Sequence, residues 1–378
     1  MTSTDVRKLE RDTMSQQPQS TGTDIDELAS PPEYIVDTRP LCQGMPFVLT
    51  DAAHPRLVLK HGSHFLVLDQ SALIPDCNTL GYGYYRYDTR HLAQWEITLN
   101  GAPLSLLSSS VNEGYAGQFL YTNPQTESLS QQKITVQREV VLSDLLWERL
   151  TLQSFHNVPL DVELKLSFQS DFADMFEVRG LNVPERGKRM VPVPGQNGRT
   201  LFLAYRGLDN ALLETLIEFF GAQPHEITKE GEITFRFTLP VHQPREIQMC
   251  ISTRWDGQIT APEVRRTGYN DARRAADERY REWCNRGAQV RTGHDLLDLA
   301  VDRAYRDLYI LRQPTPRGFG LSAGIPWYCA LFGRDSAITA WQILPFLPDL
   351  SRECIEVLAA YQGQGDDVYR AEQPGRIL

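Results

Sequence analysis

The spacing of hydrophobic residues changes about two thirds of the way along the chain. Before residue 260, apolar and polar positions alternate, as in Trp95, Ile97 and Leu99, which is the period of a half-buried β-strand. The alternation recurs at residues 56–60, 64–69, 134–142, 162–168, 233–239 and 247–251. Many strands without helical stretches between them are typical of antiparallel sheets. The pattern therefore predicts a large antiparallel β-sandwich over residues 34–260.

Three stretches of this region carry further signals. Asn100-Gly101 directly follows an alternating segment and is a strong signal for a short hairpin. Residues 210–220 (NALLETLIEFF) fit either a strand or a helix, and both interpretations stay open. In residues 134–142 the alternation runs through Ile134, Val136, Val140 and Leu142.

Toward the end of the chain the apolar spacing becomes helical. A first helix is expected in YNDARRAADERYREWCNRG, which ends at Gly287. A second is expected over HDLLDLAVDRAYRDLYILR, opened by Thr292 and Asp295 as a capping box. Two more helices are predicted at about 335–344 and 350–362. The predicted buried face of the second helix consists of Leu297, Val301, Ala304, Leu308 and Leu311.

These patterns divide the chain into three parts. Residues 1–33 are rich in Ser, Thr, Gln and Asp and predict a disordered tail. Residues 34–260 predict the β-sandwich, and residues 261–378 predict a helical domain. The four expected helices have few partners against which to bury their apolar faces. We therefore expect the helical domain to be incomplete, with Leu378 at the edge of a fragment.

Composition narrows the class of ligand. The net charge of −10 argues against a nucleic-acid or anionic membrane partner and leaves a neutral ligand, such as a sugar, open. No apolar run approaches the about 20 residues of a spanning helix, and the N-terminus lacks the apolar core of a secretory signal. The six cysteines show no pairing pattern, so we expect reduced thiols and a cytoplasmic protein.

Signals for metals and cofactors are weak. His61 and His64 form an H-x-x-H around Gly62, without nearby carboxylate or cysteine partners. Walker, G-x-G-x-x-G, G-x-S-x-G and H-E-x-x-H motifs are missing from the sequence. The sequence therefore predicts neither a metal nor a cofactor.

Arg334 and Asp335 stand side by side in FGRDS (332–336), within an otherwise apolar stretch. Burying adjacent opposite charges is costly, so the presence of this pair calls for a structural or a functional explanation. A structural interpretation is that Asp335 and Ser336 cap the start of a helix. A functional one is that the guanidinium and the carboxylate bind the vicinal hydroxyls of a sugar. The aromatic side chains that would then supply an apolar face, or else pack between helices, are Trp327, Tyr328 and Trp341.

Carboxylates and tyrosines gather in two earlier segments. SDFADMFEVRG (170–180) places Asp171, Asp174 and Glu177 at intervals of three. They are either the paired carboxylates of a glycosidase or a metal site, or acidic residues that cap a turn and pair with Arg179.

In GYGYYRYDTRHL (81–92), Arg86, Asp88 and Arg90 alternate, which predicts an ion-pair ladder across neighbouring strands. The default role of such a ladder is stabilisation of the sheet. The alternative is that the four tyrosines of the segment form a stacking surface for sugar rings.

Together, GYGYYRYDTRHL, DFADMFEVRG and GIPWYCALFGRDS resemble the signature segments of the bacterial glycogen-debranching, amylo-α-1,6-glucosidase-like family. The order of the segments matches, and the resemblance covers the chain from about residue 40 onward. It implies a β-supersandwich-like domain followed by the start of an (α/α)6 barrel similar to that of glucoamylases. In those relatives a barrel pocket holds the terminal glucose, which two carboxylates hydrolyse with inversion.

The same resemblance assigns roles to individual residues. Arg334 and Asp335 match an Arg-Asp segment that grips the terminal sugar, so they are assigned to substrate binding with Trp327 and Tyr328. Asp335 is also the candidate general acid. PGRIL (374–378) matches a segment that continues in the family as His-Glu, and this chain stops before it. An inverting pair needs two carboxyls about 6.5–9.5 Å apart, and the sequence nominates only one.

Three hypotheses follow. The first is a fragment of an α-glucan-acting glycoside hydrolase that, when complete, cleaves α-1,6- or related glucosidic bonds with inversion and without a cofactor. Its partner would be an α-glucan oligosaccharide or glycogen, and the oligomeric state stays open. The second is a non-catalytic module that binds glycan or assembles with a partner. The third is a shortened product that aggregates through exposed helix faces.

Overall fold

The computed structural model describes residues 33–35, 56–76, 80–127, 129–256, 258–259, 267–368 and 372–377. The predicted tail therefore lies outside the described residues except for Glu33. The chain forms two compact units. The β unit holds the described residues up to Leu59 and from Leu66 to Arg273. The helical unit holds Lys60–Phe65 together with residues from Arg274 onward.

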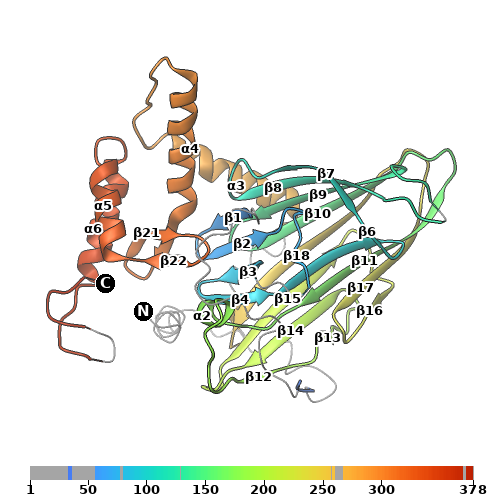
Figure 1. Ribbon diagram of the computed structural model, residues 1–378, viewed down its shortest axis with the longest axis horizontal. Coiled ribbons are helices and arrows are strands. Elements are labelled where there is room, and N and C mark those ends of the chain that lie inside the picture. Colours follow the sequence, from blue (N-terminus) through green and yellow to red (C-terminus); the bar gives the residue numbers. More distant parts are fainter. Residues whose placement is uncertain are drawn as a thin grey trace. The chain divides into compact units, whose positions relative to one another are not determined.

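Most of the β unit is antiparallel sheet (Figure 1). The strands of the largest sheet are β7 (Ser105–Ser110), β8 (Ala116–Thr122), β9 (Ile134–Leu142), β10 (Leu146–Ser154), β12 (Lys188–Arg189), β13 (Val193–Pro194), β14 (Thr200–Arg206), β15 (Leu212–Phe220), β18 (Arg245–Trp255) and β19 (Gln258–Ile259). They follow the order β12-β14-β15-β18-β10-β9-β8-β7, with β13 beside β14 and β19 beside β18. Neighbouring strands pair in antiparallel register, for example Leu150 of β10 with Ile247 of β18.

Two further sheets contain the other strands described before residue 260. One has the order β16-β17-β11-β5-β6, and the other the order β1-β2-β3-β4. Their strands are β1 (Leu57–His61), β2 (His64–Leu68), β3 (Gly83–Arg86), β4 (Thr89–Leu92), β5 (Gln94–Leu99), β6 (Ala102–Pro103), β11 (Leu160–Gln169), β16 (Glu226–Ile227) and β17 (Glu232–Leu239).

The two larger sheets pack face to face. Phe219 of β15 meets Phe235 of β17 with ring centres 5.3 Å apart, and Arg138 of β9 lies 4.2 Å from the ring centre of Trp95 on β5. These side chains are buried, so the alternating positions mark the inner side of each sheet. The prediction of a mostly antiparallel, layered β-domain is confirmed.

Two local sequence signals in the β unit can be compared with the structure, the expected turn at Asn100-Gly101 and the undecided segment 210–220. Asn100 and Gly101 form the predicted turn between β5 and β6, with φ values of 50° and 75° that suit a two-residue hairpin. Residues 210–220 contain strand β15, which pairs with β14 on one side and β18 on the other. Most of β15 is buried on both faces, which removes the polar alternation that identifies a strand.

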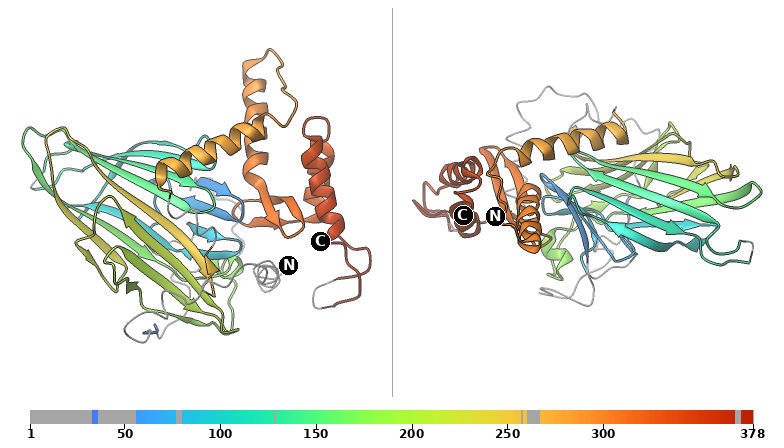
Figure 2. Two further views of the ribbon diagram at one scale, coloured as in Figure 1. Left: turned by 180° about the vertical axis from the view of Figure 1, so that it is seen from behind. Right: turned by 90° about the horizontal axis from the view of Figure 1, so that it is seen from above.

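The helical unit is only partly helical. Its helices are α3 (Tyr269–Cys284, which begins in the β unit), α4 (Asp295–Leu311), α5 (Gly333–Ile343) and α6 (Pro348–Ala360). Between α4 and α5 lie three antiparallel strands, β20 (Arg312–Thr315), β21 (Gly318–Gly324) and β22 (Tyr328–Leu331). The helices at about 335–344 and 350–362 are confirmed, and α5 and α6 lie side by side (Figure 2). The sheet was not predicted, and the (α/α)6 barrel stays a prediction.

Helix α4 departs from the sequence prediction in two ways. Its N-cap is His294 without a side-chain hydrogen bond, while the Thr292 hydroxyl donates to Asp298 at 2.8 Å, so the capping box with Asp295 was wrong. The predicted face is also wrong, because Leu297 is exposed and the buried residues of the helix are Tyr309 and Ile310. Periodicity fixes which side chains share a face, but burial depends on what packs against that face.

Candidate functional site

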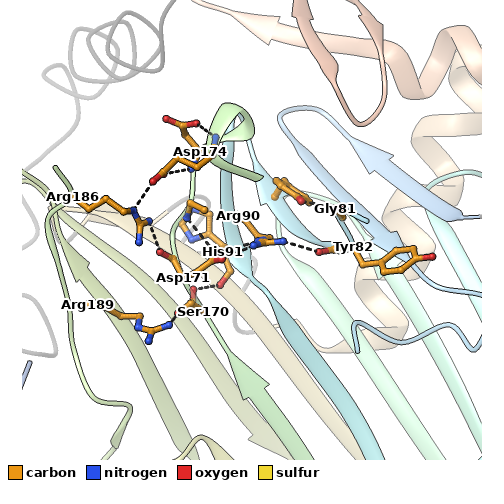
Figure 3. Close-up of polar contacts among 12 residues, drawn as sticks. Gly81, Tyr82, Arg90, His91, Ser170, Asp171, Asp174, Arg186 and Arg189 are labelled. Atoms are coloured by element: carbon orange, nitrogen blue, oxygen red, sulfur yellow. Dashed lines mark hydrogen bonds and ion pairs between the residues drawn. The ribbon is translucent and has the colours of Figure 1, made fainter. Parts of the chain in front are cut away.

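An arginine and an aspartate that are 81 positions apart form the centre of a buried polar cluster in the β unit (Figure 3). Arg90 Nε donates to Asp171 Oδ1 at 3.1 Å, and Arg90 Nη2 donates to Asp171 Oδ2 at 2.5 Å. Neither side chain is exposed to solvent. Two parallel hydrogen bonds between a guanidinium and a carboxylate make a strong, directionally fixed pair.

Backbone groups hold this pair in place. The Arg90 N–H donates to the Ala173 carbonyl at 2.9 Å, and the Ala173 N–H donates back to Asp171 Oδ1 at 3.2 Å. Arg90 Nη1 also donates to the Tyr82 carbonyl at 3.4 Å. Strand β4, the segment after β11 and the segment before β3 therefore meet at one guanidinium.

The acidic residues that follow Asp171 form a helix cap. In α2 (Met175–Val178), Asp174 accepts from the Glu177 N–H, and Glu177 accepts from the Asp174 N–H at 2.9 Å. Arg186 pairs with Glu177 at 2.6 Å and donates to the Asp171 carbonyl oxygen at 2.8 Å. The prediction that acidic residues of this segment cap a turn is therefore confirmed. The arginine that pairs with Glu177 is Arg186, and the predicted pairing with Arg179 stays a prediction.

The electrostatics of Asp171 suit a structural anchor. Burial alone would raise the pKa of Asp171, but the charge and hydrogen bonds of Arg90, the Ala173 N–H and the charge of Arg186 together lower it. The carboxylate is thus ionised at neutral pH, with both oxygens engaged. It has the character of a fixed support rather than of a proton donor.

The tyrosine-rich segment belongs to the core. Tyr82, Tyr84 and Tyr85 are buried, and the Tyr85 hydroxyl donates to the Gly81 carbonyl at 2.9 Å. Burial raises the pKa of Tyr85 to about 12. These three rings therefore do not form the stacking surface for sugars that the sequence suggested.

The predicted ion-pair ladder in this segment was wrong. Strand β3 ends at Arg86 and β4 begins at Thr89, so Tyr87 and Asp88 form the turn between them. A tight turn reverses the chain direction, so Arg86, Asp88 and Arg90 do not alternate along one strand.

The β unit contains a second buried arginine–carboxylate pair that sequence reasoning missed. Arg138 Nε of β9 donates to Glu148 Oε1 of β10 at 2.7 Å, and both side chains are fully buried. Glu148 Oε2 has no hydrogen-bond partner among the described residues. Burial raises the pKa of Glu148 to about 7, against the opposing charge of Arg138. The sequence did contain a sign of this pair. In residues 134–142 every second position is apolar except position 138, where an arginine takes the place of an apolar residue.

In the helical unit, Arg334 and Asp335 lie in the first turn of α5. The N-cap is Phe332, so the prediction that Asp335 caps the helix was wrong, although a carboxylate in the first turn still suits the helix dipole. The side chains are 85% and 44% exposed, and Arg334 Nε lies 3.9 Å from Asp335 Oδ2. The pair is thus at the surface, and the expected cost of burial does not arise.

Arg334 and Asp335 line a hollow of about 210 Å³. Its walls come from the end of α4, from β21 and from the start of α5, with Leu308, Leu311, Leu321, Ser322, Ala323, Arg334, Asp335, Ser336, Ile338 and Thr339 as lining residues. Ser336 is buried and its hydroxyl donates to the Leu321 carbonyl at 3.1 Å, which ties α5 to β21. The hollow therefore combines one guanidinium, one carboxylate and hydroxyls with an aliphatic wall.

The predicted aromatic residues lie outside this lining. Tyr328 packs edge-on against Phe332 with ring centres 5.9 Å apart, and Trp341 is 76% exposed on α5. The structure thus brings together Arg334 and Asp335 at the hollow, while the roles of Trp327 and Tyr328 stay predictions.

His61 and His64 flank the turn of the β1–β2 hairpin. Across the described ranges, no three His, Cys, Asp or Glu side chains gather as they would around a metal ion. Among the same residues, every helix is too short or too polar to cross a lipid bilayer.

The fold and the hollow define an antiparallel β module followed by a helical unit with a small polar site. Residues 59–250, just over half of the chain, match the family described as the N-terminal domain of some glycogen debranching enzymes. The chain belongs to this family. A search of curated protein sequences found no match.

A solved structure with a similar fold has low sequence identity to this chain. A proposed kojibiose phosphorylase from the human microbiome has a TM-score of 0.54 and 10% identity, over 81% of this chain and 47% of that one. The chain thus spans about half the length of that protein. A proposed aldose 1-epimerase from Escherichia coli K12 has a TM-score of 0.29 and 10% identity, over 53% of this chain and 99% of that one.

Proposed function

We propose that the protein acts on α-glucans and that the hollow beside Arg334 and Asp335 binds a terminal sugar unit. The observation that carries the proposal is the meeting, at one hollow, of an exposed guanidinium and an exposed carboxylate. Each hydroxyl of a sugar both donates and accepts a hydrogen bond, so neighbouring hydroxyls fit a donor and an acceptor placed side by side. Membership of a family of glycogen debranching N-terminal domains supports an α-glucan as the source of that sugar.

The remaining lining suits the less polar side of a sugar ring. Leu308, Leu311 and Ile338 offer aliphatic contacts, and the hydroxyl of Thr339 offers a further hydrogen bond. Trp327 and Tyr328 stay part of the proposal as nearby aromatic side chains that a longer glucan would reach.

Hydrolysis of a bound sugar requires a second catalytic group in addition to Asp335. Inversion needs a second carboxyl about 6.5–9.5 Å from the first, with a water between them. Among the described residues that line the hollow, Asp335 is the one carboxylate. We therefore assign substrate binding to this site, with Asp335 as general acid only where a second carboxyl reaches the bound sugar. With such a second carboxyl, the protein would be an inverting α-1,6-glucosidase, in the cytoplasm and without a cofactor.

Calorimetric titration with maltotetraose and with a branched α-1,6 oligosaccharide tests the binding site. Arg334→Ala and Asp335→Ala are each expected to weaken binding about tenfold or more, since a hydrogen bond to a charged group contributes about 1.5–3 kcal/mol. Arg303 and Asp307 form a similarly exposed pair on α4 outside the hollow, so Arg303→Ala and Asp307→Ala are matched controls. Binding that is equal in all four variants would reject the site.

An assay of glucose release from the branched oligosaccharide separates the two main hypotheses. Saturable binding without release supports a glycan-binding module in this chain. Release that Asp335→Asn abolishes supports a complete hydrolytic site. Lack of binding by a folded wild-type protein would reject both.

A further inference from the structure

The C-terminal end of α4 is held by side chains from two other segments of the helical unit. Lys60 Nζ donates to the Ile310 carbonyl at 2.9 Å and to the Arg312 carbonyl at 3.2 Å. The Ser322 hydroxyl donates to the Leu311 carbonyl, which lies between them, at 2.9 Å. The last carbonyls of a helix have no partner within the helix, so these donors replace a local cap.

Lys60 is unusually placed for a lysine. It is fully buried at the turn of the β1–β2 hairpin, and its third hydrogen bond goes to the Gly62 carbonyl at 2.7 Å. An ammonium group has three donors, and here three backbone carbonyls accept from it. Burial lowers the pKa of Lys60, against an opposing effect from Cys329. A cation at this end of a helix is favoured by the helix dipole.

The carbonyls that Lys60 holds flank a wall of the hollow. Leu308 and Leu311 are the α4 residues of the lining, and Leu311 lies between the two acceptors on α4 and β20. Ser322 caps Leu311 and lines the hollow itself. The hairpin thus holds the end of α4 from about 250 residues away in the sequence, while Ser322 ties that same end to β21.

We propose that Lys60 is a positioning residue for the sugar site, because it holds the end of α4 that forms one wall of the hollow. The proposal rests on the proposed function of that hollow. Lys60 is not among the lining residues, so its effect reaches the ligand through Leu311 and Ser322.

Hydrogen–deuterium exchange of the full chain, followed by mass spectrometry, tests the positioning. Lys60→Met keeps the length of the side chain and removes its donors. Peptides over residues 305–324 are expected to exchange at least tenfold faster, while peptides of β9 and β10 keep their rates. Ser322→Ala is a milder second variant that removes one cap, with a smaller change in the same peptides. Lys165→Met on β11, which loses a half-exposed lysine paired with Glu232, is the control.

Maltotetraose titration provides the second readout. Lys60→Met is expected to weaken binding at least fivefold, and Lys60→Arg, which restores the donors, is expected to recover part of the loss. Unchanged exchange at residues 305–324, or a uniform increase in every peptide, would overturn the positioning role. Equal affinity of Lys60→Met and the wild type would also overturn it and leave the proposed function intact. Lack of oligosaccharide binding by the wild type would instead contradict the proposed function. The exchange data would still decide whether Lys60 holds α4.

Discussion

Two arginine–aspartate pairs stand in the segments that resemble debranching enzymes, and they behave in opposite ways. Arg90 and Asp171 are 81 positions apart, yet they form a buried pair with two hydrogen bonds. Arg334 and Asp335 are neighbours, yet their charged groups are 3.9 Å apart and exposed. Adjacent side chains on a helix point in different directions, whereas β4 and the segment after β11 face each other. Closeness in sequence is therefore a poor guide to pairing.

This difference in burial indicates that the Arg90–Asp171 pair supports the fold and that the Arg334–Asp335 pair belongs to a binding surface. The Arg90–Asp171 pair uses both carboxylate oxygens internally and joins three segments of the β unit. The Arg334–Asp335 pair leaves its donors and acceptors available at a hollow. Breaking the first should affect folding, and breaking the second should affect ligand binding.

The largest effect is expected from Asp171→Asn. Loss of the carboxylate charge leaves the buried guanidinium of Arg90 uncompensated, which should lower the free energy of unfolding by about 3–5 kcal/mol. Urea unfolding followed by circular dichroism measures it. Asp335→Asn, at the exposed pair, is the matched control. A loss below about 1 kcal/mol for Asp171→Asn would remove the distinction between the two pairs.

A pH series sharpens the comparison by adding the third pair, Arg138–Glu148. Glu148 has a folded-state pKa of about 7, above its ordinary value of 4.5, so between these values the folded chain binds more protons than the unfolded chain. Stability should therefore fall as the pH rises through this window, by roughly 3 kcal/mol from this group. Asp171 has the opposite sign, because its pKa is lowered. Its contribution is present above its ordinary pKa and is lost as the pH falls through the folded value.

Melting curves of the wild type and Glu148→Gln between pH 3 and pH 8 measure these contributions. The Gln variant should lose the decline between pH 4.5 and 7 and keep the acid-side loss attributed to Asp171. Parallel curves for the two proteins across the whole range would show that the pKa of Glu148 is the same in the folded and the unfolded chain, and would contradict the raised value.

The smallest effect on stability is expected at the exposed pair. Arg334→Ala and Asp335→Ala should each change the free energy of unfolding by less than about 0.5 kcal/mol, because solvent screens an exposed ion pair. The same urea unfolding measures it. A loss of several kcal/mol in either variant would mean that this pair also supports the fold.

The sequence predicted strands well where one face of a sheet is less buried than the other. Strand β5 alternates between partly and fully buried positions, and Trp95, Ile97 and Leu99 marked it correctly. Strand β15 could not be identified, since burial on both faces removes the alternation. The sheet β20–β22 was missed because short strands within a helical region carry too little periodicity.

In the candidate site too, some residues could be found from the sequence and others could not. Sequence reasoning found Arg334 and Asp335 because an unusual charged pair in an apolar stretch is visible in the residues themselves. It could not find Lys60, because a lysine two residues before a glycine in a hairpin has the composition of an ordinary exposed turn. It also could not decide that Asp171 pairs with Arg90, since that choice depends on which strands become neighbours.

The sequence by itself determined the change from strand to helix period, the turn at Asn100-Gly101 and the caps within SDFADMFEVRG, because each depends on residues a few positions apart. Tertiary structure alone decided which charges are buried, which are exposed, and which side chain closes the end of α4. These outcomes depend on desolvation and on distances between segments far apart in the chain, and neither is a property of a local stretch of sequence.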